Sequence, residues 1–141
     1  MRCLGLDLGS KTLGVAISDK TGTIATKHSI IRHNEEYERL VLEVLKLVEE
    51  EKIERIVLGF PKNMNNSIGY KGELSLTFQK MLEKKLSIPI VLQDERLTTK
   101  EAEDILIRNH TRRDKRKKVI DSLAATIILQ EYLDKEKRKY E

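Results

Sequence analysis

The sequence predicts an α/β protein: a mixed five-stranded sheet, an antiparallel meander followed by β-α units, with helices on both faces. Three strand-like stretches separated by turn-sized gaps open the chain, and amphipathic helices then alternate with short apolar strands. The chain has 141 residues, of which 39% are hydrophobic and 35% are charged. This length and composition are typical of one globular domain, so we expect a single domain over residues 1–141.

The first 32 residues are typical of an antiparallel meander. Residues 2–8 and 13–18 are largely apolar, and the four residues 9–12 between them are a gap the size of a turn. A second turn leads to residues 23–32, the third expected strand. Strands joined by such short connections pair antiparallel.

The remainder of the chain predicts helices alternating with strands. Apolar side chains recur at helical spacing over residues 35–51, and Asn34 is the expected N-cap of this helix. The other elements expected are strand 54–60, loop 61–72, helix 73–86, strand 88–92, helix 99–108 and helix 117–137. The complete order resembles the ribonuclease H-like arrangement.

Positive charge is concentrated in one short window of the chain. Residues 108–118 hold seven Lys/Arg and one Asp, whereas the whole chain has a net charge of only +4. Such a run is typical of a surface that binds polyanions, with a solvated loop as the alternative. The residues expected to hold a nucleic-acid backbone are Arg112, Arg113, Lys115, Arg116, Lys117 and Lys118. Lys11 and Arg96 are candidates for phosphate contacts, or are surface charges.

Composition excludes several classes of protein. Aromatic residues make up 4% of the chain and Trp is absent, which argues against a single-strand binder built on base stacking. Cys3 is the only cysteine, so there is no intrachain disulfide, and we expect it in the core. No apolar run approaches the roughly 18–20 residues that span a bilayer. Met1 leads into a strand pattern without an apolar leader, so we expect a cytoplasmic protein with no membrane partner.

Asp7 is the sharpest candidate for a functional side chain. It stands between Leu6 and Leu8 inside an apolar strand, where Asp is rare and costly to bury without a partner. The flanking Gly5 and Gly9 leave room for close approach by another backbone or by a ligand. A structural carboxylate that caps the following turn is the alternative.

Three further carboxylates lie at positions where a site can form. Asp94 and Glu95 follow the apolar strand 88–92, and functional groups gather at the carboxyl ends of such strands. They should point to opposite faces, so only one is expected to join a site; a polar loop is the alternative. Asp121 lies one turn before two alanines that let a helix approach the sheet, or it is a partner of the helix dipole.

Carboxylates from a strand, a strand end and a helix can converge on a metal. Oxygen ligands of this kind suit Mg²⁺ or Mn²⁺, and two such ions can activate water and stabilise the leaving oxygen of a phosphodiester. His28, His33 and His110 have no metal-ligand spacing, and no Ser-His-Asp or Cys-His arrangement stands out. The pattern therefore favours a metal-dependent nuclease.

Four segments resemble the YqgF family, also called RuvX-like. They are GLDLGSKTLGVAISD at 5–19, IVLGFPKNMNNSIG at 56–69, DERLTT at 94–99 and DSLAATIILQEYL at 121–133. The resemblance implies a ribonuclease H-like fold and a cytoplasmic nuclease that matures the 5′ end of pre-16S rRNA on a ribosomal precursor. A Holliday junction resolvase in DNA recombination and repair is the second activity it implies. By motif match, Asp7, Glu95 and Asp121 fall on the family's proposed metal-binding carboxylates.

Other functions remain open from the residues alone. GLDLGSKT also resembles the first phosphate motif of the actin, Hsp70 and sugar-kinase superfamily, whose members need two such domains. A non-catalytic nucleic-acid-binding module on the same fold would keep the basic run and use the carboxylates structurally. The nuclease hypothesis covers structured RNA first and branched DNA second.

Overall fold

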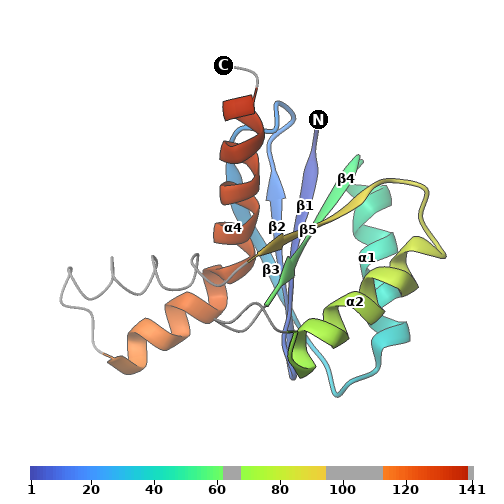
Figure 1. Ribbon diagram of the computed structural model, residues 1–141, viewed down its shortest axis with the longest axis vertical. Coiled ribbons are helices and arrows are strands. Elements are labelled where there is room, and N and C mark those ends of the chain that lie inside the picture. The colour runs from blue at the N-terminus through green and yellow to red at the C-terminus, as the bar shows by residue number, and fades with distance from the viewer. Residues whose placement is uncertain (62–67, 95–112, 140–141) are drawn as a thin grey trace.

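The computed structural model describes residues 1–61, 68–94 and 113–139, with residues 113–122 and 139 described by their backbone alone. Five strands form one sheet in the order β3-β2-β1-β4-β5 (Figure 1). Their bounds are β1 Cys3–Leu8, β2 Thr12–Ser18, β3 Ala25–Arg32, β4 Arg55–Phe60 and β5 Ile90–Asp94. The first three strands pair antiparallel, and β4 pairs in parallel with both β1 and β5. The predicted mixed five-stranded sheet is confirmed.

Helices cover both faces of this sheet, as predicted (Figure 1). Their bounds are α1 Tyr37–Glu50, α2 Tyr70–Glu83 and α4 Arg113–Lys139. α1 and α2 lie on one face, and α4 packs across the other against β1, β2 and β3. Among the described residues, none of the helices is both long enough and apolar enough to cross a bilayer.

Alternation along β1 separates two hydrophobic cores. Leu4, Leu6 and Leu8 belong to the larger core, which lies under α1 and α2. Cys3 belongs to the smaller core beneath α4, and Gly5 faces the same helix. Cys3 is therefore the core residue that the sequence predicts, and burial raises the pKa of its thiol.

α4 lies unusually close to the middle of β1, and Gly5 makes this possible. A Cβ atom at position 5 would be 2.7 Å from the Cβ of Leu129 and 3.0 Å from the carbonyl oxygen of Ala125. Real side chains do not approach this closely, so any residue larger than glycine would push the helix outward.

The carboxyl ends of three strands meet at one edge of the sheet. Gly5 on β1 lies opposite Val57 on β4, and Val57 lies opposite Val91 on β5. Because these three strands are parallel, each ends on the same side of the molecule. Ligands of open α/β sheets bind outside this edge, so it is the natural place for a site.

Predicted boundaries are wrong at the start of α1, at both ends of α2 and at the end of β5. α2 covers Tyr70–Glu83 instead of residues 73–86, so its first turn lies in the stretch expected to be a loop. Glu36, not Asn34, is the N-cap residue, and Glu35 turns the chain with a φ of 68°. The backbone N–H of Asn34 instead donates to the carboxylate of Glu36. β5 extends to Asp94, so Gln93 and Asp94 lie within the strand, not in a loop after it.

The basic window is also organised differently from its prediction. α4 begins at Arg113 instead of residue 117, so residues 113–118 form its first turns, not a loop before it. Figure 1 shows this first part of α4, in orange, extending beyond the sheet. The helix predicted over 99–108 lies outside the described residues.

Candidate active site

Asp7 lies near the carboxyl end of β1 and is half-buried on the face that α4 covers. Its partner across the antiparallel pair is Gly14 on β2. A Cβ atom at Gly14 would be 3.7 Å from the Cβ of Asp7 and 3.5 Å from the Cβ of Ala125 on α4. Position 14 therefore lies between Asp7 and the helix, close to both.

β5 brings one more oxygen donor toward the same edge and face. Gly5, Val57 and Val91 lie side by side on β1, β4 and β5. Asp7 and Gln93 each follow two residues later on their own strand, so they lie level with each other and both face α4. Gln93 is half-buried.

The two consecutive acids at the end of β5 are separated by strand alternation. Asp94 lies opposite Phe60, on the same face as Leu92 and the larger core, so it does not share the face of Asp7. Glu95, the next residue, lies outside the described residues.

The direction of α4 relates Asp121 to Asp7. Tyr132 accepts a hydrogen bond of 2.6 Å from the guanidinium of Arg55 at the start of β4, whereas Ala125 lies beside Gly14 and thus near Asp7. α4 therefore runs antiparallel to β1, and the part of α4 with the lower residue numbers lies at the carboxyl edge of the sheet.

The distance along α4 from Ala125 to position 121 matches the distance along β1 from Gly5 to Asp7. Position 121 precedes Ala125 by four residues, about 6 Å of helix. Asp7 follows Gly5 by two residues, about 6.6 Å of strand. The backbone thus brings position 121 to the edge where β1 ends; its side chain lies among those not described.

His33 holds the turn that follows Asp7, a role that its sequence context does not indicate. This buried imidazole lies 2.9 Å from the Gly9 carbonyl oxygen through Nε2, and its Nδ1 accepts the Glu35 N–H at 3.0 Å. Nδ1 is therefore an acceptor, which assigns the proton to Nε2 as donor to Gly9. The His33 backbone N–H also donates to the Lys11 carbonyl oxygen at 2.9 Å.

We expect His33→Ala to lower the free energy of unfolding by about 1–3 kcal/mol, because it leaves the Gly9 carbonyl and Glu35 N–H unpaired. Urea unfolding measures the change. His28→Ala is the matched control, since His28 is exposed and its described polar contacts are Ser29 at 2.9 Å and a loose contact with Glu51 at 3.8 Å. A loss no larger for His33 than for His28 would contradict the role of His33.

The predicted cationic residues lie in three places relative to the described structure. Lys11 is exposed in the β1–β2 turn, next to the end of the strand that carries Asp7. Arg96 and Arg112 lie outside the described residues. The remaining ones are described as backbone positions in the first two turns of α4, namely Arg113, Lys115, Arg116, Lys117 and Lys118.

Comparison with known proteins gives close relatives over nearly the whole chain. The family model described as RuvX, Holliday junction resolvase, matches residues 1–135. A protein of Bacillus subtilis named "Putative pre-16S rRNA nuclease" is 53% identical over 135 residues, covering 95% of this chain and 98% of that protein. A protein of the same name from Caldanaerobacter subterraneus is 52% identical over 138 residues, covering 97% and 99%.

Solved structures share the fold at low sequence identity. RuvC of Thermus thermophilus, in complex with a Holliday junction substrate, superposes with a TM-score of 0.61 at 15% identity and covers 92% of this chain and 90% of that one. The yeast mitochondrial Holliday junction resolvase Ydc2 gives 0.53 at 14% identity, covering 93% and 77%. The ribonuclease H-like fold expected from the sequence is confirmed.

Proposed function

Because the chain belongs to the RuvX Holliday junction resolvase family, we propose that it is a metal-dependent nuclease acting on structured nucleic acid. Its proposed substrate is the 5′ end of pre-16S rRNA in a ribosomal precursor particle, after the name of its relatives. The observation that carries this proposal is Asp7, a half-buried carboxylate at the carboxyl edge of the sheet on the face that α4 covers.

Asp7, Glu95 and Asp121 are the residues we propose as ligands of Mg²⁺ or Mn²⁺, two ions in number. The strand register brings Gln93 to the same edge and face as Asp7, so its amide oxygen is a further ligand of the kind these ions take. A hard cation prefers this all-oxygen set, whereas zinc prefers His and Cys. When bound, such ions activate water for attack and stabilise the leaving oxygen of the phosphodiester.

The protein groups have separate tasks in this proposal. Asp7, fixed in a central strand, sets the position of the cleaved phosphate along the sheet edge. Lys11 and Arg96 contact neighbouring phosphates. The basic positions Arg112, Arg113, Lys115, Arg116, Lys117 and Lys118 attract and hold the backbone. An rRNA precursor as the substrate also implies that the protein works in the cytoplasm.

A Holliday junction resolvase is the second candidate, favoured by the description of the matching family. Both candidates need the same carboxylates and cations, because backbone contacts carry no sequence information. A non-catalytic binding module is the third candidate and predicts binding without cleavage.

We expect purified full-length protein to cleave a 5′-extended 16S rRNA precursor in Mg²⁺ or Mn²⁺ and to stop in excess chelator. The same assay should include single-stranded RNA and a four-way DNA junction. Preferential cleavage of the junction would replace the rRNA proposal by the resolvase. Cleavage that persists in excess chelator would overturn the metal mechanism, and binding without cleavage would support the third candidate.

A further inference from the structure

A cationic hollow lies at the β3 end of the same sheet edge, beside the turn that follows Asp7. Its volume is about 370 Å³. Its lining residues are Lys11, Arg32, His33, Asn34, Glu36 and Arg39. Three of these are cations and one is an acid, so the hollow carries a net positive charge with His33 as the neutral tautomer.

The cations of this hollow are available to a ligand. Within the described part of the chain, the side chains of Lys11 and Arg32 have neither a hydrogen bond nor an ion pair, and both residues are exposed. Arg39 donates to the Arg32 carbonyl oxygen at 2.8 Å, which holds its guanidinium at the hollow. An isolated surface cation is ordinary, but three that line one hollow concentrate their field.

The single acid neutralises only part of this charge. A Glu36 carboxylate oxygen lies 3.9 Å from Arg39, a loose ion pair between half-exposed side chains. Backbone N–H groups of Glu36 and Asn34 hydrogen-bond the carboxylate and lower its pKa. Glu36 therefore stays ionised and offsets one of the three positive charges, so the hollow keeps a net positive charge.

Arg32 and Asp7 lie on the same face of the sheet. Asp7 lies opposite Gly14, and Gly14 lies opposite Ile30 on β3. Arg32 is two residues beyond Ile30, whereas the intervening Ile31 packs into the larger core on the other face. Two strand spacings across and two residues along give about 12 Å between the Cα atoms of Asp7 and Arg32.

We propose that Lys11, Arg32 and Arg39 form a phosphate subsite that binds the nucleic-acid backbone a few nucleotides from the cleaved bond. This rests on the proposed function and adds to it a requirement on the substrate. The strand must continue past the cleavage position toward β3, while the basic positions of α4 bind other phosphates. Guanidinium groups suit this task because they contact phosphate oxygens in pairs.

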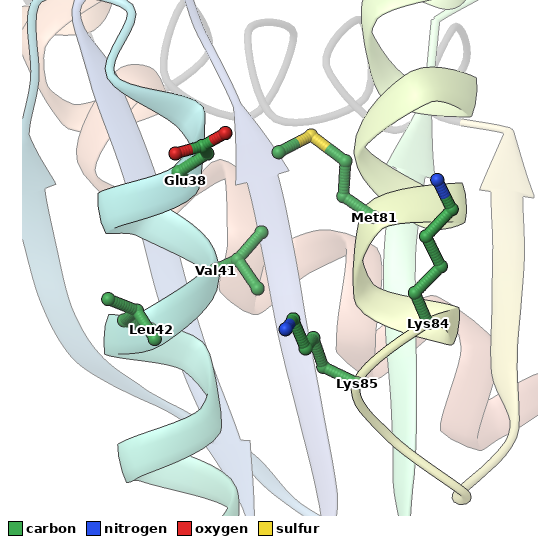
Figure 2. Close-up of a pocket in the computed structure, with 6 residues that line it drawn as sticks. All are labelled: Glu38, Val41, Leu42, Met81, Lys84 and Lys85. Atoms are coloured by element: carbon green, nitrogen blue, oxygen red, sulfur yellow. The ribbon is translucent and has the colours of Figure 1, made fainter.

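The test compares two pairs of substitutions with equal loss of charge. Arg32→Gln with Arg39→Gln removes the subsite. Lys84→Gln with Lys85→Gln removes two exposed cations from a different hollow, between α1 and α2 on the other face of the sheet (Figure 2). Both pairs are made in Asp7→Asn protein, so that binding of the 5′-extended rRNA precursor is measured without cleavage.

We expect the arginine pair to reduce the slope of log affinity against log salt by about 1–2 and to weaken binding about tenfold. The lysine pair should leave both unchanged. Glu36→Gln should instead strengthen binding, because it removes the one negative charge of the hollow. Circular dichroism checks that each variant is folded. Arg32→Gln alone is a second control, because the Arg32 side chain makes no described contact and its loss should affect binding without affecting folding.

Equal effects of the arginine and lysine pairs, or no effect of the arginine pair, would overturn the subsite. The same experiments give a different result if the proposed nuclease function is wrong. If the wild-type protein never cleaves but the arginine pair still lowers the salt slope, the subsite is correct and the protein binds nucleic acid without cleaving it. If the wild-type protein cleaves and the arginine pair binds normally, the nuclease stands and the subsite is wrong.

Discussion

Asp7→Asn is expected to reduce metal-dependent cleavage by more than about 100-fold while the protein stays folded. Even groups that only orient metal ligands cost about 10–100-fold when they are removed, and Asp7 is proposed as a ligand itself. The substitution keeps the shape of the side chain and removes its charge. Initial cleavage rates in Mg²⁺ and in Mn²⁺ measure the loss.

Thermal unfolding supplies a second readout of the same variant. Metal at about one hundred times its Kd should stabilise the wild-type protein by about 2.7 kcal/mol and the variant much less. Without metal, the variant should be at least as stable as the wild type, because it relieves repulsion among carboxylates. A variant that unfolds, in a protein that metal never stabilises, would make Asp7 a structural residue.

Asp94→Asn is the matched control for Asp7→Asn. Asp94 is also an aspartate at the carboxyl end of a parallel strand, but it stands on the opposite face of the sheet. We therefore expect cleavage within a few-fold of wild type. Equal loss in both variants would mean that charge at this edge, and not the position of Asp7, controls activity.

Gly5→Val is expected to lower the free energy of unfolding by about 1–3 kcal/mol or more, the usual cost of overpacking. The added side chain would meet Leu129 and the backbone of Ala125, so α4 must move away from β1. For a chain of this size the Tm should fall by roughly 3–10 °C. The cleavage rate should also fall at assay temperatures well below the Tm, where the variant is still folded, because the displaced α4 carries Asp121.

Gly14→Ala tests whether the close contact at Gly5, and not the loss of a glycine from a strand, destabilises the protein. Its Cβ atom would lie 3.5 Å from Ala125 and 3.7 Å from Asp7, which are ordinary van der Waals distances. Both glycines are in strands that face α4, so we expect the alanine variant to change the Tm by only about 2 °C. If Gly14→Ala were as destabilising as Gly5→Val, the close approach of α4 to β1 would not be the cause.

The order of elements and the face of Asp7 follow from local patterns along the chain. Hydrophobic periodicity separates strands from helices without reference to distant residues, and the order of elements then indicated the mixed sheet. Asp7 could be selected because a carboxylate inside an apolar strand is costly wherever that strand lies. The prediction that Asp94 and Glu95 point to opposite faces likewise rests on the period of two, and the structure places Asp94 on the face away from Asp7.

Boundaries, and groups that meet across the fold, required the tertiary structure. α1 starts after Glu36 because hydrogen bonds among residues 33–36 shape the turn before it, whereas Asn34 alone looked like a sufficient cap. The cationic hollow joins Lys11 in the first turn to Arg32 and Arg39, more than 20 residues later. Such a juxtaposition depends on strand register and helix packing, which long-range contacts set and no local pattern encodes.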